Sequence, residues 1–229
     1  MMSETGARQL TFDLPTRTAL GREDFFVSPA NAAALQGIEA WQSWPQRRAV
    51  LTGPSGSGKT HLAHVWAALA GASVISAANL ATDAVPSLVR QGAVCVEDAD
   101  RGGDEAALFH LYNLCGAEGA GLLITGTGAP KDWPIALPDL ASRLQSLPSL
   151  QLTAPDDALL QAVFLKQFAD KQVIVSPNVV AFLAPRIERS FAELRRIVVE
   201  LDAVALAERS PVTIPLARRV LDKTGAADT

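Results

Sequence analysis

Residues 53–60 have the residue types and spacing that bind the phosphates of a nucleotide. They read Gly-Pro-Ser-Gly-Ser-Gly-Lys-Thr, a complete match to the P-loop pattern. The glycines let the backbone curl so that successive N–H groups point inward, and Lys59 can place a positive charge beside the β- and γ-phosphates. A Gly-rich turn that only joins a strand to a helix is the alternative. The full motif favours binding of ADP or ATP with Mg²⁺. We assign this binding to Gly53, Pro54, Ser55, Gly56, Ser57, Gly58, Lys59, Thr60 and His61, with the Thr60 hydroxyl as a Mg²⁺ ligand.

Two adjacent carboxylates follow the apolar run at residues 93–96. Glu97 would hold the Mg²⁺ ion through water, and Asp98 would polarise an attacking water. This order is the reverse of the usual one, and aspartate is one methylene shorter than the glutamate commonly found at the second position, so efficient hydrolysis is not assured. Acidic residues also follow strands as helix caps, which is the alternative for this pair.

Short aliphatic runs alternate with helical patterns between residues 29 and 152. Alternation of this kind predicts a parallel sheet built from βαβ units, and continuous apolar runs are typical of strands covered on both faces. We therefore expect an α/β fold with a parallel five-stranded sheet. The expected strands are 48–52, 73–76, 93–96, 122–125 and 150–152, and the expected helices are 29–44, 59–70, 79–90 (with Asn79 as its N-cap), 104–117 and 137–144.

The rhythm changes after Pro155, where helical patterns cover 156–170, 176–185, 190–208 and 215–222. Residues 211–214 are the only strand-like piece. Ser190 followed by Glu193 has the spacing of a capping box. We expect a tail at residues 1–20, a nucleotide-binding base at 21–153 and a small α-helical domain at 154–229.

The composition is that of a folded globular protein. Of 229 residues, 48% are hydrophobic and 19% are charged, which excludes wholesale disorder. The net charge of −4 argues against a protein that clamps nucleic acid non-specifically. The apolar stretches are too short for a membrane span, the first residues contain no secretion-type apolar region, and two cysteines are too few for a disulfide framework. We expect a cytoplasmic protein without a membrane partner.

Beyond the P-loop, four short segments resemble the AAA+ ATPases. The resemblance is strongest to DnaA-related proteins of the Hda type and spans roughly residues 20–225. It implies a five-stranded αβα base with a helical lid. The segments that carry it, in addition to the P-loop and the acid-ended strand, are 109–113 (FHLYN), 122–126 (LLITG), 137–144 (LPDLASRL) and 212–215 (VTIP).

The resemblance also implies roles for single residues. Thr125 or Thr127 would be the polar group near the γ-phosphate, and Arg143 would be an arginine finger offered across a subunit interface. Phe26 and Val27 would pack on the adenine ring. The alternatives are a solvated arginine at a helix end and a hydrophobic plug for the first helix.

In the helical domain, the sequence departs from the pattern of these related proteins. Ala192 stands where the initiator carries a nucleotide-sensing arginine. By helical spacing we expect Arg195 and Arg196 to point elsewhere. Nucleotide cycling like that of the initiator is therefore in doubt, although nucleotide binding is not.

The N-terminal segment 9–14 (QLTFDL) resembles the peptide by which replication proteins dock on the sliding clamp. Gln9 would hydrogen-bond at the rim of the groove, and Leu10, Phe12 and Leu14 would be apolar anchors. An added edge strand is the alternative for this alternating pattern.

Three functions remain open. The first is a negative regulator of replication initiation that docks on the DNA-loaded clamp and stimulates hydrolysis of DnaA-bound ATP through Arg143. The second is an autonomous AAA+ ATPase such as a helicase loader, and the third is a nucleotide-locked adaptor. A basic recognition helix is not evident, so we expect no direct sequence-specific DNA binding. A homodimer is compatible with the sequence, but no feature establishes one.

Overall fold

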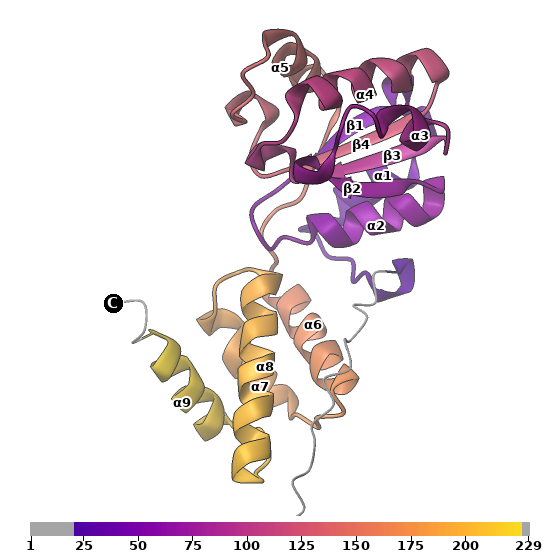
Figure 1. Cartoon of the computed structure of the whole chain (residues 1–229). Helices are drawn as coiled ribbons and strands as arrows, with labels where there is room; N and C mark the ends of the chain where they lie inside the picture. The colour runs from indigo at the N-terminus through magenta and orange to yellow at the C-terminus, as the bar shows by residue number, and fades with distance from the viewer. Residues whose placement is uncertain (1–20, 226–229) are drawn as a thin grey trace, which may run out of the picture.

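The structure is a computed structural model that describes residues 21–225 (Figure 1). Its centre is a parallel five-stranded sheet in the order β2-β3-β4-β1-β5, which confirms the predicted α/β class. The neighbouring strands β1 and β4 are buried along their whole length. The strands are β1 (Arg48–Thr52), β2 (Ser73–Ser76), β3 (Ala93–Glu97), β4 (Gly121–Gly126) and β5 (Ser149–Gln151).

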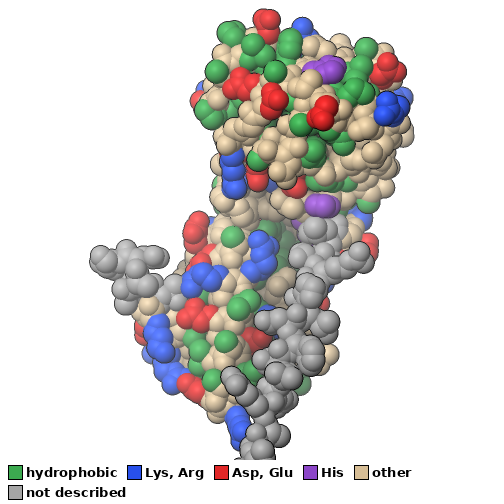
Figure 2. All heavy atoms as spheres, in the orientation of Figure 1, with side chains coloured by type: hydrophobic (Ala, Val, Ile, Leu, Met, Phe, Trp, Pro, Cys, Tyr) green, Lys and Arg blue, Asp and Glu red, His purple; other side chains and the backbone are tan. Residues whose placement is uncertain are grey.

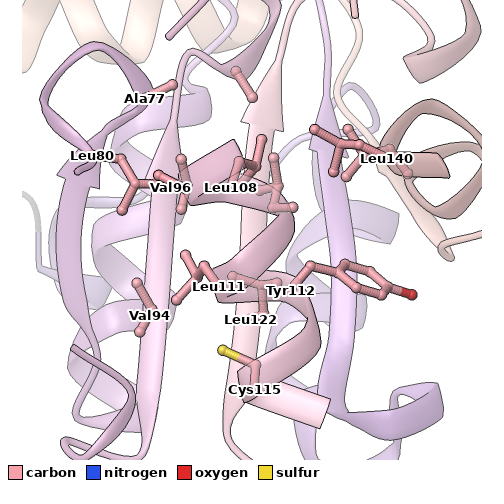
Figure 3. Close-up of a cluster of buried hydrophobic side chains, with 14 of the residues drawn as sticks. Ala77, Leu80, Val94, Val96, Leu108, Leu111, Tyr112, Cys115, Leu122 and Leu140 are labelled. Carbon is pink, nitrogen blue, oxygen red and sulfur yellow. The ribbon is translucent and has the colours of Figure 1, made fainter. Parts of the chain in front are cut away.

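Helices cover both faces of the sheet, because successive strand residues point to opposite sides. Ala49 and Leu51 pack with α1 (Ala32–Glu39) and α2 (Lys59–Ala70). Val50 packs on the other side with three helices, and Figure 3 shows α4 side chains facing Val94, Val96 and Leu122 of the sheet. These three helices are α3 (Val85–Val89), α4 (Glu105–Glu118) and α5 (Pro138–Gln145).

Residues 157–225 form a lid with its own hydrophobic core, which includes Phe164, Phe168 and Leu194. Its helices are α6 (Asp157–Asp170), α7 (Pro177–Leu183), α8 (Phe191–Glu208) and α9 (Ile214–Gly225). The expected N-cap at Ser190 is confirmed, since its side chain accepts the Glu193 N–H at 3.1 Å. Figure 1 and Figure 2 show the lid as a lobe separate from the base.

Two predicted elements are wrong. The helix expected over 79–90 is a 3₁₀ turn at Ala77–Asn79 followed by the five residues of α3, so Asn79 does not cap this helix. Pro86 explains the late start, because proline is tolerated only in the first turn of a helix. The strand expected at 211–214 does not form. Val212 packs in the lid core, and the Thr213 hydroxyl accepts the Leu216 N–H at the start of α9.

The first predicted helix is shorter than expected, since α1 ends at Glu39 and a 3₁₀ turn follows. Within residues 21–225, no helix is long and apolar enough to cross a membrane. The short 3₁₀ turns are Arg22–Asp24, Trp41–Ser43, Pro45–Arg47, Ala77–Asn79, Ala99–Arg101, Pro130–Asp132 and Ala184–Arg186.

Candidate nucleotide-binding site

The P-loop joins the end of β1 to the start of α2, as the sequence predicts. Gly56 and Gly58 have φ values of +70° and +98°, a backbone region that favours glycine. Gly58 is the N-cap residue of α2, so the positive end of that helix dipole lies at the loop. The backbone of this loop is therefore arranged to bind an anion.

The Lys59 ammonium lies folded against its own loop. Its Nζ donates to the carbonyl oxygens of Gly53 and Pro54 at 2.9 and 3.0 Å, and to Thr127 Oγ1 at 3.4 Å. Lys59 is 9% exposed, and within residues 21–225 no carboxylate lies within 4.0 Å of it. Burial lowers the pKa of Lys59, while Asp100 and Asp98 act in the opposite direction. A buried ammonium whose direct contacts are neutral oxygens is suited to bind a phosphate.

A pocket of about 530 Å³ opens beside the loop. Its walls come from three parts of the chain: the segment before α1, the P-loop with the end of β3, and helices α6 and α8 of the lid. It brings together many of the predicted nucleotide-binding residues, namely Phe26, Ser55, Gly56, Gly58, Lys59, Thr60, His61 and Asp98.

Other predicted residues lie outside this lining. Val27 is 53% exposed and Ser57 is buried. Gly53 and Pro54 act through their carbonyl groups, which hold Lys59. His61, in contrast, does line the pocket, and its Nε2 is 3.1 Å from the Gly21 oxygen. The remaining predicted residues outside the lining are Glu97, Thr125 and Thr127.

The ends of β3 and β4 meet beside the P-loop. Thr125 is 1% exposed, and its hydroxyl accepts the Asp98 N–H at 3.2 Å. Asp98 itself has a φ of +57°. Thr127 is the threonine that contacts Lys59, and its carbonyl accepts the Trp133 indole N–H at 2.9 Å. The two threonines thus differ: Thr125 positions the backbone of Asp98, and Thr127 reaches the P-loop lysine.

The residues expected to hold Mg²⁺ fit an ion that has few protein ligands. Glu97 Oε1 is buried and has no hydrogen-bond partner among the described residues, and Thr60 lines the pocket. The part of the chain that the structure describes holds no group of three or more His, Cys, Asp or Glu side chains that could bind a metal ion. Mg²⁺ is usually bound by one or two carboxylates together with waters and phosphate oxygens. Glu97 and Thr60 fit that arrangement.

Arg143 lies on α5, exposed, and is not among the residues that line the pocket. Its guanidinium lies 5.1 Å from the Phe109 ring centroid and 5.4 Å from that of Tyr112. Both rings belong to α4, so cation–π contacts hold Arg143 on the surface of the base. No carboxylate within residues 21–225 forms an ion pair with it.

The segment that leads into α5 is fixed by Glu105, a residue that sequence reasoning did not single out. Its carboxylate accepts the N–H groups of Ala136 and Leu137 at 2.9 and 2.7 Å. Glu105 lies in the first turn of α4, more than 30 positions earlier, and no local pattern connects the two segments. This contact fixes the residues that precede α5, the helix that carries Arg143.

The lid touches the P-loop directly. The Phe191 N–H at the start of α8 donates to the Gly56 oxygen at 2.8 Å. A Cβ on Gly56 would lie 2.6 Å from the Ser190 Cβ, and one on Gly58 would lie 3.2 Å from the Phe191 ring. The glycines therefore allow the lid helix to approach as well as the loop to curl.

The expectation that Arg195 points away is wrong, because Arg195 lines the pocket together with Phe191 and Ala192. Residues three and four apart share a helix face, so Arg195 lies one turn along α8 from those two. Arg196 lies on another face, where it pairs with Glu193 and Glu200.

A parallel five-stranded sheet, a P-loop after its first strand and a helical lid over that loop define an AAA+ P-loop fold. Residues 157–221 match a protein-family model described as the lid domain of Hda. The fold is similar to domain III of the replication initiation protein DnaA from Thermotoga maritima, with a TM-score of 0.75 and 19% identity over 92% of this chain and 98% of that one. The chain therefore has an AAA+ fold, with a lid that matches the family model of the Hda lid domain.

Two further solved structures share the fold. AMPPCP-bound DnaA from Aquifex aeolicus has a TM-score of 0.61 and 17% identity, over 79% of this chain and 63% of that one. The Holliday junction branch migration motor RuvB from Thermotoga maritima has a TM-score of 0.62 and 16% identity, over 76% and 61%. At these identities the comparison with solved structures establishes the fold alone.

Proposed function

We propose that this chain is a nucleotide-bound negative regulator of replication initiation, which docks on the sliding clamp and stimulates hydrolysis of DnaA-bound ATP. The observation that carries the proposal is Arg143. It is an exposed arginine outside the chain's own pocket, without a carboxylate partner among the described residues. An arginine placed in this way is available to a nucleotide held by a neighbouring subunit.

The pocket would hold ADP or ATP with Mg²⁺. Lys59 would leave the carbonyl oxygens of its loop and donate to the β- and γ-phosphates, while the N–H groups of the loop hold the phosphate oxygens. Thr60 and Glu97 would hold the ion, which neutralises phosphate charge when bound. Phe26 lines the wall nearest α1, where an adenine ring would pack. The DnaA structure with bound AMPPCP supports a nucleotide in this fold.

The partner of Arg143 would be ATP-bound DnaA, and the Hda-type lid supports this choice. The guanidinium would neutralise negative charge that develops on the transferred phosphoryl group of the partner's ATP. The aromatic rings of Phe109 and Tyr112 would hold the side chain against the surface of α4 before DnaA binds. The product of the encounter is ADP-bound DnaA.

The clamp contact would come from Gln9, Leu10, Phe12 and Leu14, which lie outside the described residues. A short extended peptide gives modest affinity that a ring-shaped, multivalent partner can amplify. On the face drawn in Figure 2, basic and acidic side chains are interspersed on both lobes. This pattern supports contact with DNA through the clamp instead of through a basic stripe.

The experiment that tests the role of Arg143 measures hydrolysis of DnaA-bound ATP in the presence of DNA-loaded clamp and this chain. Arg143→Ala should remove stimulation, by about 10³-fold or more for an arginine finger. Arg90→Ala is the matched control, because Arg90 is also an exposed arginine of the base but lies at the end of α3. Stimulation that survives Arg143→Ala would rule out the arginine-finger assignment.

Two binding measurements test the remaining parts. Lys59→Ala should abolish binding of ADP and ATP, and binding with normal affinity would show that the P-loop is not the main phosphate site. Gln9→Ala combined with Leu10→Ala should abolish capture of the chain on immobilised clamp. Capture that is unchanged would mean that the clamp contact lies elsewhere.

The alternative is an autonomous AAA+ ATPase, which the placement of Asp98 in the pocket wall favours. Asp98 is also held in an ion pair of 3.5 Å with Arg101, which competes with its use as a base. Turnover of ATP by the isolated chain separates the two functions. Robust turnover without partners would favour the alternative.

A further inference from the structure

A short segment before α1, residues 21–26, forms part of the wall of the pocket beside the P-loop, and we call it the strap. Asp24, Phe25 and Phe26 of the strap line this pocket. Figure 1 shows the strap, drawn in indigo, at the level where the base and the lid meet. The strap is therefore placed to contact both lobes.

The strap is held to the base at three points. The Gly21 oxygen lies 3.1 Å from Nε2 of His61, which belongs to α2. Phe25 is buried in the core of the base, and its ring meets the His61 ring edge-on at a centroid distance of 5.2 Å. Arg22 forms an ion pair of 2.9 Å with Glu39 of α1. These contacts make the strap part of the base.

The lid reaches the strap through Lys166 of α6. Lys166 Nζ lies 3.0 Å from Asp24 Oδ1, and the two side chains are only 23% and 20% exposed. The hydrogen bond to Asp24 raises the pKa of Lys166, so the lysine is charged at neutral pH. Lys166 also pairs with Asp170 at 3.3 Å, but Asp170 lies one turn further along the same helix. The pair with Asp24 thus joins the two lobes, whereas the pair with Asp170 stays within the lid.

The lid consequently touches the base at two places in the pocket wall. At the start of α8, the Phe191 N–H donates to the Gly56 oxygen of the P-loop, and on α6 Lys166 pairs with Asp24. All four of these residues line the pocket. Movement of the lid away from the strap would break the ion pair and widen the pocket between them.

We propose that the ion pair between Asp24 and Lys166 is a latch that keeps the lid closed over a bound nucleotide and slows its release. The inference rests on nucleotide binding at the P-loop, as proposed above, and it assigns the regulation of that site. The free energy of the ion pair favours the closed state, because the pair must break before the lid and the strap can separate. Opening of a lid is often the step that limits the release of a ligand. A slowly exchanging nucleotide suits a chain whose proposed target is ATP held by another protein.

The test measures release of ADP with a fluorescent label on its ribose from the full chain, after mixing with excess unlabelled ADP. Asp24→Asn keeps the size of the side chain but removes its charge, and it should speed release about 5–30-fold. A direct effect of the charge has the opposite sign, since the Asp24 carboxylate repels an anionic nucleotide and its loss would slow release. Asp170→Asn is the matched control, because it removes the other partner of Lys166 and keeps the contact between the lobes. This variant should release ADP within about twofold of the unaltered rate.

A double variant tests whether Lys166 acts through Asp24. Lys166→Met should speed release by a similar factor, and combining it with Asp24→Asn should produce no further increase, because both substitutions remove the same ion pair. If Lys166 instead contacted the nucleotide independently of Asp24, Lys166→Met would speed release equally with or without Asp24→Asn. That result would overturn the latch.

Lys59→Ala separates this inference from the proposed function. If the unaltered chain retains the labelled ADP, Lys59→Ala does not bind it and Asp24→Asn releases it at the unaltered rate, the latch is wrong while the nucleotide site stands. If the unaltered chain binds no ADP, both the latch and the nucleotide site are wrong.

Discussion

Replacing Gly56 with alanine should break the contact between the P-loop and the lid. Gly56 has a φ of +70°, and its carbonyl accepts the Phe191 N–H. The added Cβ would lie 2.6 Å from the Ser190 Cβ and 3.3 Å from the Ser190 Cα, so backbone as well as side chain must move. The substitution therefore combines backbone strain with a steric clash.

The two contributions can be separated with a second glycine. Gly71, at the C-terminus of α2, has a φ of +64°, and a Cβ there would meet nothing within 4 Å. A left-handed conformation costs an L-residue about 1–2 kcal/mol, and this cost applies to both alanine variants. Crowding of a packed contact costs about 1–3 kcal/mol more, and it applies to Gly56→Ala alone. We expect Gly56→Ala to be the more destabilising by that difference.

Urea unfolding without nucleotide measures this difference, and hydrogen exchange of the Phe191 amide reports the contact itself. If the lid moves away to relieve the clash, the energetic difference shrinks but the Phe191 amide exchanges faster in Gly56→Ala than in Gly71→Ala. Equal unfolding free energies together with equal Phe191 exchange would refute the inference that α8 packs on the P-loop.

Three further predictions concern other sites. Burial raises the pKa of Cys95 and raises that of Cys115 to about 11, so both thiols should react with a thiol reagent only on unfolding; fast reaction in the folded chain would contradict this. Burial lowers the pKa of His61 below 6.5, so its contribution to the unfolding free energy is complete above pH 6.5 and is lost as the pH falls. The unaltered chain should lose more stability than His61→Gln between about pH 7.5 and 5.5, and equal losses would exclude this linkage. Glu105→Ala should slow stimulated hydrolysis of DnaA-bound ATP, because the segment before α5 loses its hydrogen-bond acceptor, whereas the affinity for ADP should not change. The double variant with Arg143→Ala should lose no more stimulation than Arg143→Ala alone. An additive loss would show that Glu105 does not act through Arg143.

Features encoded by neighbouring residues were predictable. The P-loop is contiguous, so its place between β1 and α2 followed from the motif and its flanking patterns. The N-cap at Ser190 is equally local, since the bond it makes reaches only three residues along the chain. The parallel sheet followed from the alternation of apolar runs with helical patterns.

The site features that depend on tertiary packing were not predictable. The face of α8 that meets the pocket is set by its contact with Gly56, so spacing alone misplaced Arg195. Glu105 holds the segment before α5 across more than 30 residues of sequence. The pattern at 211–214 suits a strand, but Val212 finds its apolar contacts in the lid core instead.

The central claim is that Arg143 acts on ATP held by another protein. The most direct measurement is single-turnover decay of labelled ATP preloaded on DnaA, with this chain and DNA-loaded clamp added in excess. We predict fast decay with the unaltered chain and decay at the unstimulated DnaA rate with Arg143→Ala, while both bind ADP equally well. Equal acceleration by the two chains would contradict the account.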